Sequence, residues 1–329
     1  MALPSTRLRR ALSAASMAAA SLAAASAYGQ GEDWPAQPVH VVVGFAPGGT
    51  ADMVARAVSQ KLSETLKQSF IVENRPGAGG NVATQYTARA KPDGYTLILN
   101  TVGAVAVNPA LYKKLPADPV KDFVPVVQVA NVPNVLVVHP SVPVKTLEEF
   151  IAYLRKHPGK LSYGSTGVGT SAHLSAVMFN QRVDASSTHI PYKGGGTVLN
   201  DLLAGRLQYM FATIPYVVQQ LGPDKLLPLA VTSSKRSSTL PGVPTLAEQG
   251  FPDYESGSWL GFFVPKGTPA PVVARLNQAV NQVLPSIEAQ MRNEGADVVG
   301  GSEEQFAQFI ARESAKWREV VESTGASAD

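Results

Sequence analysis

Short apolar runs alternate along the chain with longer segments that are apolar on one face only. Residues 39–45 form an almost continuous β-branched run, and the segment after it places Val54, Val58, Leu62 and Leu66 on one face of a helix. Further strands are predicted at 70–73 and 95–99, with a helix at 81–90 between them. Short buried strands that alternate with helices are typical of a parallel sheet. The pattern therefore predicts an α/β fold.

The same alternation begins again after two further apolar runs, at 124–129 and 135–138, which residues 131–134 separate. Thr146 and Glu149 have the spacing of a capping box and predict the start of the next helix. Strands are then predicted at 161–165, 187–191, 207–211 and 227–232, and helices at 171–181 and 197–203. These residues form a second α/β series.

The last part of the chain departs from this alternation. A proline- and glycine-rich segment at 240–257 leads to an aromatic strand at 259–264 and to two long helices, at about 271–293 and 302–323. We therefore expect two lobes, each a mostly parallel sheet flanked by helices, with a ligand cleft between them. The first lobe is predicted at 31–131 plus 257–329 and the second at 132–256, so that the chain crosses between them twice.

The N-terminal segment has the features of a secretory signal peptide. Residues 1–27 contain Arg7, Arg9 and Arg10 but no acid, continue as an Ala-rich apolar run and end on Ala25-Ser26-Ala27. We expect this signal peptide to be removed and the protein to be located in the periplasm. An uncleaved membrane anchor is the alternative, although the apolar run is short for a full span.

The composition excludes several classes of function. The 329 residues are 45% hydrophobic and 16% charged, which suits a chain with a sizeable core. The net charge of +3 comes from 28 basic and 25 acidic residues, and the three leader arginines account for the difference. The mature chain is therefore electroneutral and has no basic patch for nucleic acid. The absence of cysteine excludes disulfides, thiolate metal sites and a cysteine nucleophile.

Three glycine-rich loops follow predicted strands and precede predicted helices. They are residues 45–52 (FAPGGTAD), 164–171 (GSTGVGTS) and 191–197 (PYKGGGT). Such a loop directs backbone N–H groups and the positive end of a helix dipole to the carboxyl end of a parallel sheet. A tight turn would explain any one of them alone. Three in the same register predict a site for an anion.

Two phosphate-binding motifs are only partly matched. Residues 44–50 have the spacing of a P-loop start, but no lysine follows Gly49. Residues 167–172 read G-x-G-x-x-A, as in a dinucleotide-binding loop, but they lie deep in the chain and no acid ends the next predicted strand. We therefore expect no nucleotide and no other cofactor.

Catalytic and metal sites receive weak support from the sequence. Ser165 or Ser171 could be combined with His173 or His189 and Asp201 into a triad, but no G-x-S-x-G elbow is present. A secreted hydrolase that uses Ser165 and His173 is the alternative function. The five histidines show no metal-ligand spacing, so we expect neither a metal nor an enzyme.

Three polar residues in the loops have more than one interpretation. His173 falls in the first turn of a predicted helix, where a neutral imidazole could donate one N–H to a ligand or simply cap the helix. Asp52 is stabilised at a helix start whatever the function, and toward the cleft it would prefer a ligand amine or a bridging water. Lys193 is the only cation in the three loops, so a carboxylate would be held mostly by uncharged donors.

Several short motifs stand in a fixed order from about residue 35 to the C-terminus. They are Phe45-Ala46-Pro47-Gly48-Gly49 with Asp52 and Arg56, residues 73–80 (ENRPGAGG), residues 92–96 (PDGYT), Tyr163-Gly164-Ser165 with Gly169-Thr170 and His173, Pro191-Tyr192-Lys193-Gly194, and Trp259 before Gly261. This ordered set resembles the Bug family, the periplasmic substrate-binding proteins of tripartite tricarboxylate transporters.

The resemblance implies a two-lobed periplasmic-binding-protein fold that closes on a small carboxylate. The ligand would be a di- or tricarboxylate, an acidic amino acid or an aromatic carboxylate, delivered to the integral membrane subunits of the transporter. Carried over by position, the ligand-binding residues are Phe45, Ala46, Gly48, Gly49 and Asp52 on one wall and Ser165, Thr166, Gly169, Thr170 and His173 on the other, with Thr101 and Tyr192 nearby. We expect the protein to act as a monomer.

The chain departs from the family pattern at one position. Many relatives carry an acid shortly after the strand that matches residues 207–211, whereas this chain reads Phe211-Ala212-Thr213. We therefore expect the far part of the pocket to be less polar than usual, which bears on the choice of ligand.

Overall fold

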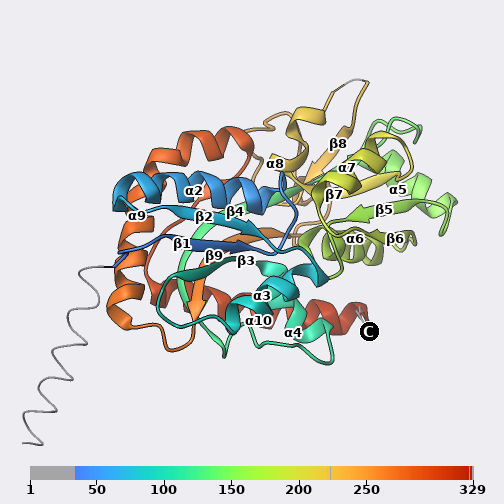
Figure 1. The fold of residues 1–329 in the computed structure, drawn as a ribbon. Helices are drawn as coiled ribbons and strands as arrows, with labels where there is room; N and C mark the ends of the chain where they lie inside the picture. Colours follow the sequence, from blue (N-terminus) through green and yellow to red (C-terminus); the bar gives the residue numbers. More distant parts are fainter. Residues whose placement is uncertain (1–33, 223, 326, 328–329) are drawn as a thin grey trace, which may run out of the picture.

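The computed structural model describes residues 34–222, 224–325 and 327 (Figure 1). The predicted signal peptide at 1–27 lies outside the described residues. Within those ranges, every helix is too short or too polar to cross a membrane.

The first sheet lies in the half of the molecule that contains the N-terminal strands. Its strands are β1 (Val39–Val43), β2 (Phe70–Asn74), β3 (Thr96–Thr101), β9 (Gly257–Pro265), β4 (Phe123–Val138) and β10 (Asp297–Val298). They follow the order β2-β1-β3-β9-β4, and β10 also pairs with β4. The first three strands are parallel to one another, whereas β9, β4 and β10 pair antiparallel.

Helices cover both faces of this sheet (Figure 1). One face packs against α2 (Thr50–Leu66) and α9 (Ala270–Glu294) through a core of valine, leucine and isoleucine. The other face packs against α3 (Asn81–Ala88), the π-helical turn η2 (Gly103–Val107), α4 (Asn108–Leu111) and α10 (Glu303–Thr324). A short turn of 3-10 helix, η1 (Ala78–Gly80), precedes α3.

The second sheet has the same layered plan. Its strands are β5 (Ser162–Ser165), β6 (Thr188–Pro191), β7 (Tyr209–Thr213) and β8 (Leu227–Val231), together with the last part of β4. One face packs against α5 (Leu147–Lys156) and α6 (Ser171–Arg182), and the other against α7 (Gly195–Leu203) and α8 (Ile214–Val217). Two short 3-10 turns, η3 (Val218–Gln220) and η4 (Ala247–Gln249), lie before and after β8.

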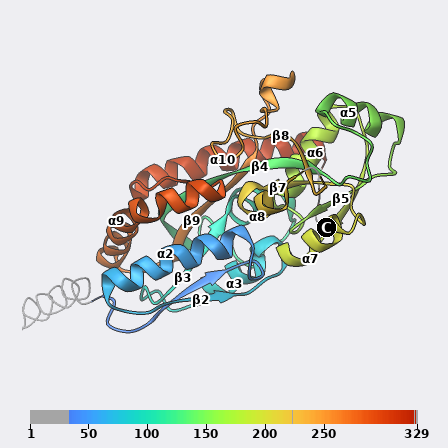
Figure 2. The same ribbon diagram turned by 90° about the horizontal axis from the view of Figure 1, so that it is seen from above.

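β4 is one continuous strand, so the predicted break at 131–134 is wrong. Its first part pairs with β9 as far as Pro133 opposite Gly257, and its last part pairs with β7 from Asn134 onward and with β8 from Val135 onward. A proline lacks an N–H group, and Pro133 is accommodated where the strand changes partners. Figure 2 shows β4 extending from the half with α2 and α9 into the half with α5 and α6.

The molecule is therefore an α/β protein of two lobes joined by strands. We call the first sheet with its helices lobe 1 and the second sheet with its helices lobe 2. The prediction of parallel strands holds for β1 to β3 and for β5 to β7, whereas the strands that join the lobes are antiparallel to their neighbours.

The predicted helix starts are found in the structure. Thr146 accepts a hydrogen bond from the Glu149 N–H at the start of α5, and the Glu149 carboxylate accepts one from the Lys145 N–H. Ser302 and Gln305 form a complete capping box at the start of α10. These caps satisfy backbone donors that the helix itself leaves without partners.

Candidate ligand-binding site

The two lobes meet around a small cavity of about 60 Å³. Its wall consists of Phe45, Gly49, Thr50, Ala51, Thr101, Ser258 and Leu260 from lobe 1 and of Thr166, Thr170, Ser171, Thr213 and Tyr216 from lobe 2. Eight of these twelve residues carry a hydroxyl group, and no residue in the wall is an acid, a lysine, an arginine or a histidine. We call this space the central cavity.

Two helices begin at the central cavity, one from each lobe. α2 follows Gly49 and α6 follows Thr170, and neither N-cap residue makes a side-chain hydrogen bond to its own helix. The first N–H groups of a helix have no partner within the helix and give that end a partial positive charge. The central cavity therefore lies between two sets of amide donors, an arrangement that favours an anion.

A second cavity of about 240 Å³ adjoins the first and shares Phe45 and Thr166 with it. The rest of its wall comes from residues 77–79 of lobe 1 and from 167–168 and 191–193 of lobe 2, with Gly44 and Tyr112. Lys193 is the charged side chain in this wall and is exposed. A ligand that extends from the central cavity would therefore approach a cation here.

The lobes touch each other beside these cavities. The Thr50 and Thr213 hydroxyl oxygens lie 2.7 Å apart across the cleft and share a hydrogen bond. Gly194 lies so close to lobe 1 that a Cβ at its position would be 2.6 Å from the Ala46 Cβ, and a Cβ at Gly79 would be 2.6 Å from the Val168 carbonyl oxygen. Glycine at these positions allows the close approach of the two lobes.

Asp52 is buried in the first turn of α2 and does not line either cavity. Its carboxylate accepts hydrogen bonds from the Gly48 N–H, the Arg56 guanidinium and the Asn74 amide. Burial by itself raises the pKa of Asp52, but these hydrogen bonds outweigh it, so that the pKa is lowered overall. The carboxylate therefore fixes the loop that carries Gly49.

Ser165 is fully buried, and its hydroxyl is used inside its own loop. The Ser165 hydroxyl donates to the Gly167 carbonyl oxygen, accepts from the Gly167 N–H and lies 2.7 Å from His189 Nε2. His173 Nδ1 accepts a hydrogen bond from the Gly169 N–H at 3.3 Å. These side chains shape the loop from behind rather than project into the cavity.

The structure brings the predicted binding residues together at the cleft but gives them different positions. Phe45, Gly49, Thr101, Thr166 and Thr170 line the central cavity, and Tyr192 lines the adjoining one. Ala46, Gly48, Asp52, Ser165, Gly169 and His173 lie in the same loops but line neither cavity. Their contact with a ligand stays a prediction.

Other residues of the wall were not foreseen from the sequence. They are Thr50, Ala51, Ser171, Thr213, Tyr216, Ser258 and Leu260. Thr50, Ala51 and Ser171 follow directly from the helix starts and could have been inferred from the loops. Thr213, Ser258 and Leu260 lie on β7 and β9, whose position beside the loops depends on the order of strands in the sheets.

The candidate triad does not assemble. The Asp201 carboxylate accepts hydrogen bonds from the Tyr192 hydroxyl at 2.6 Å and from Arg206 at 2.7 Å, and it contacts neither His173 nor His189. Burial and the hydrogen bond with Asp201 raise the pKa of Tyr192 to about 12. Among the residues with a described position, no group of three His, Asp or Glu side chains could hold a metal ion.

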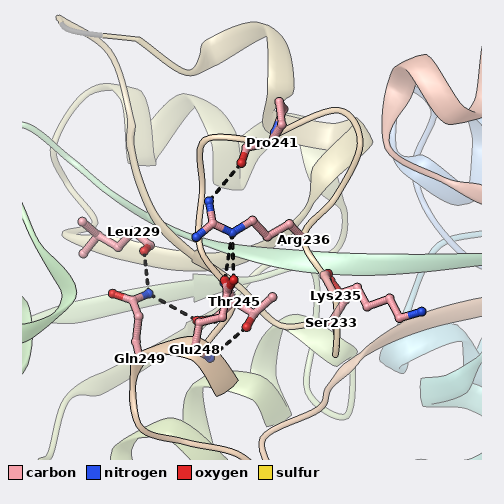
Figure 3. Close-up of polar contacts among 8 residues, drawn as sticks. All are labelled: Leu229, Ser233, Lys235, Arg236, Pro241, Thr245, Glu248 and Gln249. Carbon is pink, nitrogen blue, oxygen red and sulfur yellow. Dashed lines mark hydrogen bonds and ion pairs between the residues drawn. The ribbon is translucent and has the colours of Figure 1, made fainter.

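A larger crevice, of about 500 Å³, lies elsewhere in the described part of the chain. Residues 131–133, 233–238 and 255–259 line it together with Asp297, Phe309, Glu313, Lys316 and Trp317. Figure 3 shows its lobe 2 side, where Arg236 binds both Glu248 carboxylate oxygens and the Pro241 carbonyl while Lys235 points away. Acidic and basic side chains both line this crevice, so it lacks the anion-binding character of the central cavity.

Comparison with known sequences identifies the family. The family model described as "Tripartite tricarboxylate transporter family receptor" matches residues 54–326. The chain belongs to this receptor family. The protein BugT of Bordetella pertussis is 37% identical to the receptor over 90% of this chain and 91% of its own length. The resemblance to the Bug family is thus confirmed.

Solved structures share the fold of the receptor. The R. palustris protein Rpa4515 with adipate matches with a TM-score of 0.87 and 39% identity, covering 90% of this chain and 99% of that one. MatC from Rhodopseudomonas palustris with bound malate matches with a TM-score of 0.83 and 35% identity, covering 88% and 100%. The receptor is therefore a solute-binding protein of the periplasmic binding type.

Proposed function

We propose that the receptor captures a small carboxylate in the central cavity and delivers it to the membrane subunits of a tripartite tricarboxylate-type transporter. The observation that carries this proposal is the meeting of two helix N-termini, from α2 and α6, at a cavity without charged side chains. Amide and hydroxyl donors would hold the carboxylate and replace its hydration.

The relatives support the choice of ligand. Rpa4515 is described with adipate and MatC with malate, and both are dicarboxylates. The central cavity is small, so we propose that it holds one carboxylate and the carbons next to it. The adjoining cavity extends the space past Phe45 and Thr166 toward Lys193, which would suit a second carboxylate.

Binding and release follow from the movement of two lobes. We propose that residues 31–131 with 257–329 and residues 132–256 move relative to each other about the strands that join them. A ligand that contacts α2 and α6 together is held only when the lobes are close, so it shifts the population toward the closed form. The membrane subunits would recognise that form.

The proposal also includes the location of the receptor, its oligomeric state and its lack of catalysis. We propose that the signal peptide at 1–27 directs the receptor to the periplasm, where it acts as a monomer without a cofactor and without enzymatic activity. The wall of the central cavity holds no histidine or acid that could act as a base, which supports binding rather than turnover.

Thermal unfolding with a panel of ligands tests the function. The panel contains di- and tricarboxylates, acidic amino acids and aromatic carboxylates, and calorimetry follows for any ligand that raises the melting temperature. A ligand at a hundredfold excess over its Kd stabilises the native state by about 2.7 kcal/mol. A saturable shift without turnover supports a carboxylate carrier, and no shift with any member would contradict it.

A variant in the cavity wall links that binding to the proposed site. Gly49 has φ −87° and ψ 169°, which any residue adopts, so Gly49→Leu changes the cavity and not the backbone. We expect it to abolish binding and leave the fold intact. Gly242→Leu is the matched control, because a Cβ there has no neighbour within 4 Å. Binding retained in Gly49→Leu would place the ligand elsewhere.

A further inference from the structure

Two histidines lie behind the loop Ser165–Thr170 without lining the cavity. His173 comes from the first turn of α6 and His189 from β6, and their rings stack with centroids 4.1 Å apart at 22°. Tyr163 of β5 also stacks on the His189 ring, at 4.9 Å and 18°. The rings therefore form a rigid support beneath the loop.

Each histidine is hydrogen-bonded to the loop. The Ser165 hydroxyl oxygen lies 2.7 Å from His189 Nε2 and shares a hydrogen bond with it, and the same hydroxyl is also within hydrogen-bond distance of the Gly167 carbonyl oxygen. His173 Nδ1 accepts the Gly169 N–H. The Thr170 hydroxyl also donates to the Gly167 carbonyl and completes the turn.

The hydrogen bond from the Gly169 N–H requires a neutral His173 ring. A proton on His173 Nδ1 would meet the Gly169 N–H and remove the hydrogen bond. The titratable groups that face the pair are the two rings themselves and Tyr163, and no ion pair between described residues includes either histidine. Burial accordingly lowers the pKa of His173 to about 4, and burial with the nearby His173 lowers the pKa of His189 to about 3.

We propose that His173 and His189 are positioning residues for ligand binding. As a neutral stacked pair they hold the loop so that Thr166, Thr170 and the first amides of α6 face the central cavity, and protonation of His173 releases it. This inference rests on the proposed function of that cavity. It gives His173 a different role from the direct ligand contact that the sequence predicted.

Paired substitutions separate positioning from general stability. His173→Asn keeps an acceptor near the Nδ1 position, and His189→Gln keeps an amide that can bond the Ser165 hydroxyl near the Nε2 position. Neither new side chain titrates. His173→Leu and His189→Leu remove the hydrogen bonds and retain bulk. His157→Leu is the matched control, because His157 lies in lobe 2 at the end of α5 and bonds the Tyr153 carbonyl.

Calorimetry with adipate and malate at pH 7.5 gives the first result. We expect Kd to rise at least tenfold in the two leucine variants and to stay within threefold of the wild type in His173→Asn, His189→Gln and His157→Leu. Equal Kd values for His173→Leu and the wild type would overturn the proposal. Equal weakening in His173→Asn and His173→Leu would also overturn it.

The pH dependence gives a second result that does not require the leucine variants to fold. Between pH 7 and pH 4 the carboxylate ligand itself titrates, and it does so equally with every variant. We therefore expect the ratio of the wild-type Kd to the His173→Asn Kd to rise as the pH falls toward 4. A constant ratio would show that protonation of His173 does not release the loop.

Amide hydrogen exchange tests the positioning without any ligand. We expect residues 165–170 to exchange at least tenfold faster in His173→Leu than in the wild type or in His157→Leu at pH 7.5. Unchanged exchange would overturn the positioning role. Failure of the wild type to bind any carboxylate, with faster exchange in His173→Leu, would instead contradict the proposed function and leave the positioning intact.

Discussion

A close contact between the lobes, at Gly194 and Ala46, offers a direct test of closure. Gly194 faces Ala46 across the cleft, and its backbone is extended, with φ 161° and ψ 176°. Any residue adopts this conformation, so Gly194→Ala adds one methyl group and no backbone strain. That methyl group would stand 2.6 Å from the Ala46 Cβ, whereas ordinary contact begins at 3.4 Å. The lobes must therefore separate by about 1 Å at this point.

The size of the effect follows from this overlap. Insertion of a methyl group into a packed contact costs about 1–3 kcal/mol. The cost falls on the closed form alone, so it appears as a rise in Kd of about 5- to 150-fold. A separation of about 1 Å near Gly194 would also lengthen the hydrogen bond between Thr50 and Thr213, now 2.7 Å, beyond the usual range.

Calorimetry and unfolding together distinguish this effect from damage to the fold. We expect Gly194→Ala to bind adipate or malate more weakly while the melting temperature without ligand stays within about 2 °C of the wild type. Gly196→Ala is the control, because a Cβ at Gly196 has no neighbour within 4 Å. A Kd for Gly194→Ala within twofold of the wild type would refute the argument that contact at Ala46 belongs to the binding form.

Three other features of the structure lead to predictions about binding or stability. Thr213→Val removes the hydroxyl that meets Thr50, so we expect calorimetry to show a Kd about five- to tenfold higher, and an unchanged Kd would exclude this bond from closure. Ser302→Ala removes the capping box of α10 and should lower the free energy of unfolding by about 1 kcal/mol in urea titrations, whereas Ser234→Ala on an exposed loop should not. Burial lowers the pKa of His173 to about 4 in the folded protein, whereas the pKa of an unfolded histidine is about 6.5. Between these two pH values the unfolded state therefore binds more protons than the folded state. The free energy of unfolding should therefore fall as the pH is lowered from about 6.5 to 4, and a flat profile in urea titrations would contradict the burial of a neutral ring.

Local patterns predicted most of the elements because the strands and helices carry their own signals. β-branched runs mark the strands, and the caps at Thr146 and Ser302 mark helix starts. β10 has only two residues and exists because it pairs with Asn131 and Ala130 of β4. The continuity of β4 through Pro133 likewise depends on partners that lie far away in the sequence. Such elements leave no local pattern to read.

The site was predictable where the backbone defines it. Gly49 and Thr170 begin helices at the cavity, and glycine-rich loops before helices gave that signal. The roles of the side chains were harder to predict from the sequence. The sequence placed Asp52 and His173 toward the ligand, and their contact with a ligand stays a prediction. It could not show that the Asp52 carboxylate and His173 Nδ1 accept hydrogen bonds within their own loops. A buried polar group forms a hydrogen bond with a backbone group within reach. Which backbone groups lie within reach depends on the three-dimensional structure, which a single sequence does not show.

The central cavity and the large crevice share the strand β9. Leu260 lines the central cavity and Trp259 lines the crevice, and successive residues of a strand point to opposite faces. Both hollows are also lined by both lobes, so the proposed rotation about the joining strands would change the two together. A molecule that fits the crevice in only one lobe arrangement would therefore be thermodynamically linked to the proposed carboxylate ligand. Each would alter the affinity for the other by the same factor.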